Sequence, residues 1–86
     1  MRELTEIRKE IDRIDREVLS LFQKRMECAA QVAEYKRGTG KAIYDPVREK
    51  EKIDELTKEE ENHFVKKAVE ELFLQMMSLS RRYQYS

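Results

Sequence analysis

Residues 4–21 read LTEIRKEIDRIDREVLSL, and the apolar residues in this stretch recur in alternating steps of three and four. An α-helix with 3.6 residues per turn places such positions on one face. The spacing continues as far as Tyr35 if Arg25 takes the next position of the series. The members of this apolar stripe are Leu4, Ile7, Ile11, Ile14, Val18, Leu21, Cys28, Val32 and Tyr35. The pattern predicts one long helix with a stripe of coiled-coil type.

The predicted first helix runs from about Arg2 to Arg37, which makes it roughly 50 Å long at about 1.5 Å per residue. A compact monomer of this chain length has a radius of gyration of only about 12 Å. The helix therefore extends beyond any globule that one chain forms, and its apolar stripe needs a partner. We expect an intertwined homodimer in which the long helices of two chains pack together.

Two further helices are indicated by breaks in the sequence. The first helix is predicted to end at Gly38, since glycine readily takes the left-handed conformation of a helix C-cap. A loop then runs from Gly38 to Tyr44. Asp45-Pro46 combines a good N-cap with proline at the first helical position, so a short second helix is predicted to run to about Leu56.

The third helix is predicted to begin at Thr57, because Thr57 and Glu60 have the spacing of a capping box. Its main apolar stripe comprises Val65, Val69, Leu72, Met76, Leu79 and Tyr83. A neighbouring stripe becomes polar in its second half and comprises Phe73, Met77, Ser80 and Gln84. No stretch alternates as a strand would. The sequence thus predicts one all-α domain over residues 1–86, with a long first, a short second and a medium third helix.

The composition limits the classes of function. The chain has 18 Lys and Arg against 18 Asp and Glu, so it lacks the basic excess of a nucleic-acid-binding protein. No apolar run approaches the roughly 18 residues that a membrane span needs, and no secretory signal precedes the first helix. The lone Cys28 offers no disulfide framework. We therefore expect a cytoplasmic protein without nucleic-acid or membrane partners.

Arg25 stands where the stripe requires an apolar residue, and a guanidinium facing a core is unfavourable unless an anion meets it. Lys36 lies about 20° away around the same helix and about 16 Å along its axis. These two cations line one groove and are placed to hold opposite ends of a small dianion. An alternative is that Arg25 pairs with a carboxylate of another helix and that Lys36 is solvated near the helix C-terminus.

Three other polar residues also have ordinary interpretations. Ser80 and Gln84 share one face of the third helix, as in a solvated last turn. Arg8 lies roughly 25 Å from Arg25 along the helix, so it cannot serve the same site from its own chain. In a crossed or antiparallel dimer Arg8 would enter the partner's groove, and otherwise it is a solvated surface residue.

Asp45, Arg48 and Glu49 cluster on the first turn of the second helix. Helix capping explains Asp45, whereas Arg48 is a cation where the helix dipole disfavours one. Adjacent helical side chains diverge, so a contact between Arg48 and Glu49 is not assured.

Metal and cofactor chemistry find little support. His63 is the single histidine of the chain, which argues against metal ligation. Cys28 is expected to pack within the stripe. Because the sequence contains neither a nucleophile–base pairing nor a glycine-rich phosphate loop, we expect no metal and no cofactor.

In the order and spacing of its polar residues, the chain resembles the all-α class of chorismate mutases over almost its whole length. The residues that carry the resemblance are Ile7-Arg8-Lys9-Glu10-Ile11-Asp12, Arg25, Lys36, Asp45-Pro46-Val47-Arg48-Glu49, Ser80 and Gln84. The resemblance implies a domain-swapped helical homodimer with two equivalent sites. These sites would convert chorismate to prephenate on the route to phenylalanine and tyrosine.

The resemblance also implies a role for each matched residue. Arg8 would reach in from the partner chain to hold one substrate carboxylate, while Arg25, helped by Ser80, would hold the other. Lys36 would contact a carboxylate and the ether oxygen, and Gln84 would contact the ether oxygen from the opposite side.

By the same resemblance, Asp45, Arg48 and Glu49 would organise the entrance of the second helix, with Glu49 reaching the ring hydroxyl. The implied catalytic residues are Lys36, Gln84, Arg25 and Glu49. The implied substrate-binding residues are Arg8, Arg25, Lys36, Asp45, Arg48, Glu49, Ser80 and Gln84. Near Ser80, Met77 and the basic pair Arg81-Arg82 are expected to alter the pocket wall.

The implied reaction is an intramolecular rearrangement that needs no acid, base, nucleophile or metal. Since the chain stops soon after Gln84, we expect a free-standing enzyme without a fused domain. Two other functions stay open at this point: an isochorismate pyruvate lyase of the same fold, and a non-catalytic helical dimerisation module whose interior charges set register.

Overall fold

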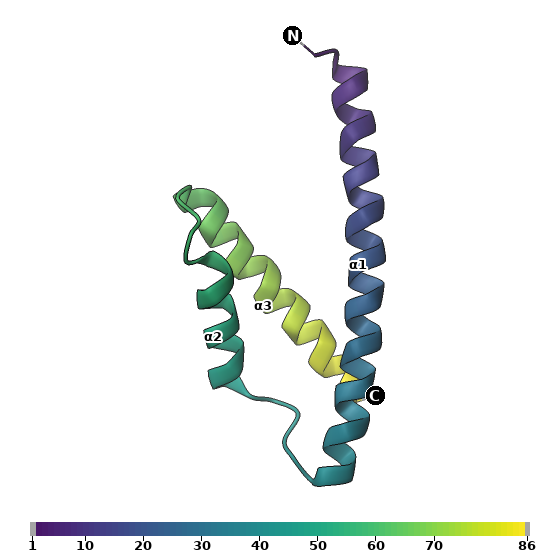
Figure 1. Ribbon diagram of the computed structural model, residues 1–86, viewed down its shortest axis with the longest axis vertical. Coiled ribbons are helices and arrows are strands. Elements are labelled where there is room, and N and C mark those ends of the chain that lie inside the picture. The colour runs from purple at the N-terminus through teal and green to yellow at the C-terminus, as the bar shows by residue number, and fades with distance from the viewer. Residues whose placement is uncertain (1, 86) are drawn as a thin grey trace.

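The computed structural model describes residues 2–85, which form three helices: α1 (Leu4–Thr39), α2 (Pro46–Thr57) and α3 (His63–Tyr85). These residues contain no strand. Figure 1 shows α1 as a long rod, with α3 crossing its C-terminal half and α2 lying along α3. The predicted all-α fold with a long, a short and a medium helix is confirmed.

The end of α1 differs from the prediction by two residues. Its C-cap is Gly40, which has a φ of 73° in the left-handed region. Gly38 stays within the helix, so its prediction as the C-cap is wrong. Lys36 and Arg37 occupy the last turn, where the helix dipole favours cations.

The start of α2 is as predicted. Pro46 takes the first helical position, and the Asp45 carboxylate accepts a hydrogen bond from the backbone N–H of Arg48 at 3.1 Å. This bond satisfies one of the N–H groups that a helix start leaves unpaired. The cap fixes the first turn of α2, and with it the two site candidates Arg48 and Glu49.

The predicted start of α3 at Thr57 is wrong. Thr57 is the last residue of α2, is 2% exposed, and donates its hydroxyl hydrogen bond to the Ile53 carbonyl at 2.9 Å. Its side chain is therefore not available as a cap. Instead α3 begins at His63, where the Asn62 side chain accepts from the backbone N–H of Val65 at 3.1 Å.

One chain buries little apolar surface. The buried apolar residues are Ala29, Ala33, Ile53 and Met77. The two alanines on α1 let α3 approach closely, and Met77 and Ser80 supply the buried face of α3. Helix α3 therefore buries the second of its two predicted stripes, whereas Val65, Leu72 and Tyr83 of its main stripe are exposed.

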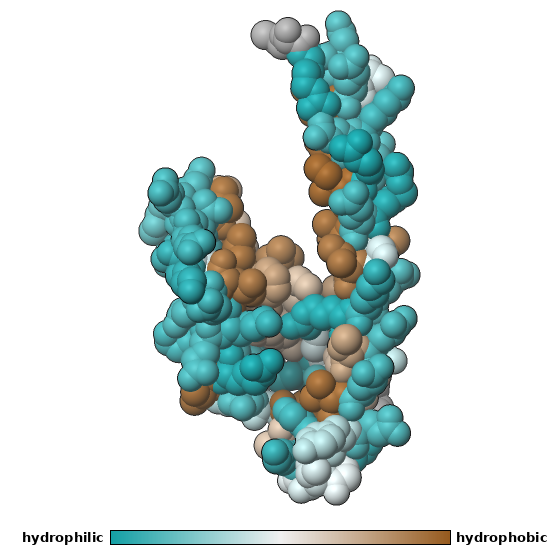
Figure 2. Space-filling model, viewed as in Figure 1, coloured by the Kyte–Doolittle hydropathy of each residue, from teal (hydrophilic) through white to brown (hydrophobic). Residues whose placement is uncertain are grey.

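The apolar stripe of α1 is exposed along its whole length, from Leu4 at 59% to Tyr35 at 63%. Cys28 is also exposed, so the expectation that it packs within the stripe is not met inside one chain. Figure 2 shows apolar side chains on the facing sides of α1 and α3, across the open end of the V that the two helices form. The radius of gyration is 16.3 Å, well above the roughly 12 Å of a compact chain of this length.

None of the helices within residues 2–85 combines the length and apolar character needed to cross a membrane.

Candidate active site

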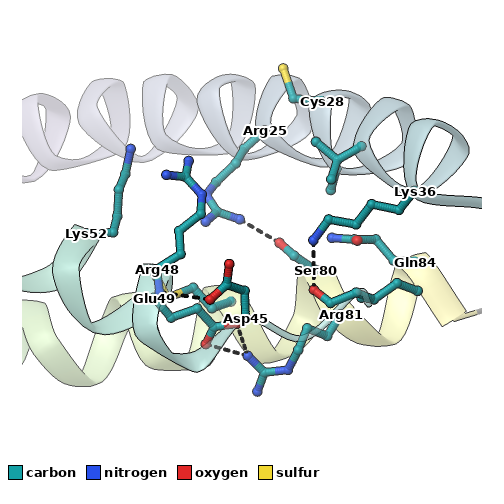
Figure 3. A pocket seen from close by; sticks show the side chains of 14 residues that line it. Arg25, Cys28, Lys36, Asp45, Arg48, Glu49, Lys52, Ser80, Arg81 and Gln84 are labelled. Atoms are coloured by element: carbon teal, nitrogen blue, oxygen red, sulfur yellow. Dashed lines mark hydrogen bonds and ion pairs between the residues drawn. The ribbon is translucent and has the colours of Figure 1, made fainter. Parts of the chain in front are cut away.

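A cavity of about 330 Å³ lies where α1, α3 and the beginning of α2 meet. Figure 3 shows its side chains converging from these three elements. Every predicted site residue except Arg8 lines it, namely Arg25, Lys36, Asp45, Arg48, Glu49, Ser80 and Gln84. Residues from three separate segments thus form one site, and the groove inferred from Arg25 and Lys36 is a wall of it.

Arg25 projects from α1 toward α3 and donates a hydrogen bond from Nη1 to the Ser80 hydroxyl at 2.5 Å. Ser80 is 6% exposed and donates in turn to the Met76 carbonyl at 3.0 Å. Ser80 is therefore buried and not part of a solvated last turn. Within residues 2–85 the Arg25 guanidinium forms no ion pair, so its half-buried charge faces the cavity uncompensated.

Figure 3 shows Lys36, from α1, and Gln84, from the last turn of α3, extending into the same end of the cavity. The Lys36 ammonium donates to the Ile43 carbonyl at 3.1 Å, and an ammonium carries two further donors. The Gln84 Oε1 atom is buried and has no hydrogen-bond partner among residues 2–85. A half-buried amide and an ammonium at the same end of the cavity are a suitable pair of donors for a ligand oxygen.

Glu49 and Arg81 form an ion pair across the cavity wall. Nη1 of Arg81 donates to both carboxylate oxygens of Glu49 at 2.5 Å, and the two side chains are only 25% and 20% exposed. The Arg81 guanidinium also lies 4.4 Å from the centre of the Tyr44 ring. The hydrogen bond to Glu49 is the main cause of a raised pKa for Arg81, against the opposing effect of burial.

Lys52, which the sequence analysis missed, also lines the cavity, as Arg81 does. Lys52 lies one turn after Arg48 on α2, a spacing that a search along the helix face would have found. The pairing of Arg81 with Glu49 carries no such signal, because it joins two helices. The basic residues of the lining are Arg25, Lys36, Arg48, Lys52 and Arg81, against the acidic residues Asp45 and Glu49. This excess of positive charge suits a small dianion.

Arg8 is exposed on the N-terminal half of α1 and does not line the cavity of its own chain. The structure agrees with the inference that one chain does not bring Arg8 to the same site as Arg25. His63 begins α3 and does not line the cavity. Among residues 2–85, no group of three or more His, Cys, Asp or Glu side chains is arranged to hold a metal ion.

Comparison with known proteins points to one family. The family model for chorismate mutase type II matches residues 7–85. The chain is 47% identical over 55 residues to a chorismate mutase of Methanocaldococcus jannaschii, an alignment that covers 64% of this chain and 56% of that protein. It is also 47% identical over 62 residues to a bifunctional chorismate mutase/prephenate dehydratase of Aquifex aeolicus, which covers 69% of this chain and 17% of that protein.

A third relative, the T-protein of Haemophilus influenzae, is 47% identical over 49 residues, or 57% of this chain and 13% of the T-protein. The matched part of this chain thus spans less than two thirds of the length of each of these relatives. The family model, however, covers α1 from Ile7 onward, all of α2 and α3, and every residue that lines the cavity. The chain therefore belongs to the chorismate mutase type II family.

Proposed function

We propose that this protein is a chorismate mutase, an isomerase that converts chorismate to prephenate, and that one domain containing all three helices is the catalytic unit. The observation that carries the proposal is the positively charged cavity, whose lining falls within the residues matched by the family model. The exposed thiol of Cys28 suits a reducing compartment, and we place the enzyme in the cytoplasm.

In the proposed reaction, one carbon–oxygen ether bond of chorismate breaks and one carbon–carbon bond forms within the same molecule. No proton is transferred and no covalent bond to the protein forms. The protein acts by holding the flexible dianion in a compact chair and by stabilising negative charge on the ether oxygen. Fixed donors from α1 and α3 suit this task better than mobile side chains on a loop.

Arg25 is held in place by Ser80 and faces the cavity, so we assign it to a substrate carboxylate, which a guanidinium binds through two parallel hydrogen bonds. Lys36 and Gln84 approach from opposing helices and are assigned to the ether oxygen. Glu49 is assigned to the ring hydroxyl.

Asp45 and Arg48 complete the entrance at the start of α2. Asp45 holds the first turn through its bond to the Arg48 backbone N–H. The Arg48 side chain extends toward the same end of the cavity as Arg25 in Figure 3, where it adds to the positive charge that attracts a dianion.

We propose further that the active unit is a homodimer in which Arg8 enters the site of the partner chain. The exposed stripe of α1 and the exposed apolar side of α3 support this arrangement, because an apolar surface this long is unfavourable in water. A second copy carries the same stripe, and two such stripes pack against each other in a symmetric contact. Arg8 belongs to the first turns of α1, and Figure 1 shows the N-terminal part of α1 extending beyond the other two helices.

The first test compares the wild type with Lys36→Ala. It measures the decrease in ultraviolet absorbance as chorismate is consumed, and it identifies the product. Removing one donor to a developing oxyanion is expected to lower kcat by roughly 1,000-fold. Lys24→Ala is the matched control, because Lys24 is exposed on the same helix and does not line the cavity. Circular dichroism checks that all three proteins stay helical.

Wild-type protein that is folded but leaves chorismate unchanged would reject the mutase. Conversion of isochorismate to salicylate and pyruvate would then indicate the lyase. A protein that acts on neither substrate, and in which Arg25→Ala changes only stability, would be a helical dimerisation module.

A further inference from the structure

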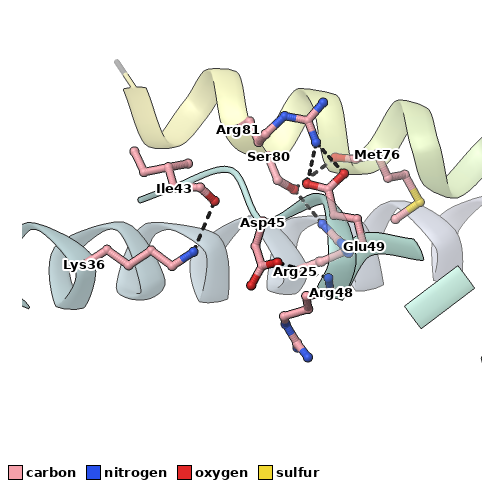
Figure 4. A network of polar contacts seen from close by, with 9 residues as sticks. All are labelled: Arg25, Lys36, Ile43, Asp45, Arg48, Glu49, Met76, Ser80 and Arg81. Carbon is pink, nitrogen blue, oxygen red and sulfur yellow. Dashed lines mark hydrogen bonds and ion pairs between the residues drawn. The ribbon is translucent and has the colours of Figure 1, made fainter. Parts of the chain in front are cut away.

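Arg81 differs from the other basic side chains of the cavity, because its charge is already paired. It binds both oxygens of Glu49, and its guanidinium is stacked over Tyr44. Figure 4 shows the Glu49 carboxylate turned toward Arg81 and away from the Arg48 guanidinium. Arg81 lines the cavity beside Glu49, and its contact with both carboxylate oxygens places it to orient that carboxylate.

Glu49 has other basic neighbours with which it would otherwise pair. Lys52 lies three residues further along α2, a spacing at which opposite charges on a helix attract, and Arg25 projects into the same cavity. Since the side chain of Glu49 is only 20% exposed, its charge is weakly screened. Without Arg81, the carboxylate would turn to a cavity cation and neutralise a charge that a dianion requires.

We propose that Arg81 is a positioning residue that holds Glu49 against the cavity wall and neutralises it, so that Arg25, Lys36 and Arg48 stay available for the substrate dianion. The inference rests on the proposed function, since it concerns the binding of chorismate. A guanidinium that contacts both carboxylate oxygens through one nitrogen suits this task, because it leaves the remaining lone pairs of the carboxylate free to accept from the ring hydroxyl.

Tyr44 strengthens the hold on Arg81. Its ring lies against the guanidinium and restricts the directions in which the long side chain can turn. Tyr44 belongs to the connection between α1 and α2, next to Ile43, whose carbonyl accepts from Lys36. The connection thus contacts α3 through Arg81 and α1 through Lys36, and both of these residues line the cavity.

The experiment measures kcat and KM for chorismate in a double-mutant cycle of Arg81→Gln and Glu49→Gln. Arg81→Gln alone is expected to lower kcat/KM by about tenfold, chiefly through a higher KM. In the Glu49→Gln background the same change is expected to alter kcat/KM by less than about twofold, because no carboxylate is left to be misdirected. Arg82→Gln is the matched control, since Arg82 is exposed, carries the same charge and does not line the cavity.

Equal losses from Arg81→Gln in both backgrounds would overturn the inference, as would a loss no larger than that of Arg82→Gln. If Arg81→Gln does not fold, Arg81→Lys and Arg82→Lys replace the variants Arg81→Gln and Arg82→Gln in both backgrounds. Arg81→Lys is expected to raise KM by less than about tenfold when Glu49 is present, and to leave KM unchanged in the Glu49→Gln background. Wild-type protein without chorismate turnover would overturn the proposed function itself. That outcome is distinct from a turnover that does not depend on Arg81.

Discussion

Arg25 illustrates how one residue that breaks a pattern points to a site. Its charge interrupts an apolar stripe, and the sequence offered two explanations: a carboxylate partner on another helix, or an anion from outside. In the structure its partner is the neutral hydroxyl of Ser80, which orients the guanidinium without compensating its charge. The second explanation is therefore favoured, and Ser80 is better described as a support for Arg25 than as a residue of a solvated helix end.

Gln84 leads to a prediction about pH. A neutral amide donates a hydrogen bond at any pH, whereas a glutamate in its place donates only when protonated, and its ordinary pKa is about 4.3. The wild type is expected to have a flat profile of kcat/KM around neutrality. In Gln84→Glu, activity should be highest in acid and should fall as the pH rises through the pKa of the new carboxyl, because the carboxylate repels the developing oxyanion.

This prediction is checked by kcat/KM for chorismate measured from about pH 3.5 to pH 8, a range that spans the ordinary carboxyl pKa. Gln75→Glu serves as a control, because Gln75 is exposed on the same helix and outside the cavity. A Gln84→Glu profile as flat as that of the wild type would exclude a hydrogen bond from Gln84 in the rate-limiting step.

Helix α2 begins at a side-chain cap that borders the cavity. Asp45 accepts from the Arg48 backbone N–H, and the turn that it fixes presents Arg48 and Glu49 to the cavity. Asp45→Ala is expected to lower the free energy of unfolding by about 1 kcal/mol, the usual cost of losing an N-cap. It should also raise KM, since the first turn of α2 then frays.

Asp45→Asn separates the two effects of this change. Asparagine caps a helix about as well as aspartate, so the urea midpoint of Asp45→Asn should stay near that of the wild type. A stability loss in Asp45→Asn as large as that in Asp45→Ala would mean that the charge of Asp45, and not its capping geometry, stabilises the chain.

The whole molecule is extended, and as a single chain it leaves much of its apolar surface exposed. Its principal extents are 56 × 26 × 16 Å, and among residues 2–85 only four apolar residues are buried. Small domains have low stability, so burial of these exposed apolar side chains against another chain would stabilise the protein. The proposed homodimer would supply that burial and would also bring Arg8 to the site of the partner chain.

Mixing two inactive variants tests whether Arg8 acts across the dimer. Arg8→Ala and Lys36→Ala are each expected to be nearly inactive, because each lacks one group in both sites. Random exchange of chains would make half of the dimers mixed, and each mixed dimer would contain one complete site, so the activity should recover to about one quarter of the wild-type value.

The control is a mixture of Lys36→Ala with Arg25→Ala. Both residues line the cavity of their own chain, so each variant chain has a defective cavity whichever partner it has. No dimer of that mixture contains a complete site, so no activity should return. A mixture of Arg8→Ala with Lys36→Ala that stays inactive after unfolding and refolding together would show that Arg8 is not contributed by the partner.

Local features of the chain were predictable from the sequence. The period of the apolar residues sets the faces of α1 and α3, and the cap at Asp45 involves residues only three apart. The grouping of Arg25 with Lys36 also follows from helix geometry alone, because both lie on one rigid element. These features depend on residues within one helix or turn, so they can be recognised in the sequence as a period or a short motif.

Other features depended on contacts between distant segments. Thr57 has the sequence signature of a cap but is buried at the end of α2, and Asn62 caps α3 in its place. Which stripe of α3 is buried, and which carboxylate Arg81 binds, follow from how α3 lies between the other two helices. The local sequence pattern determines which apolar and polar faces a helix has. Only the packing of the helices determines which of those faces are in contact, because the free energy gained by burial depends on both contacting surfaces.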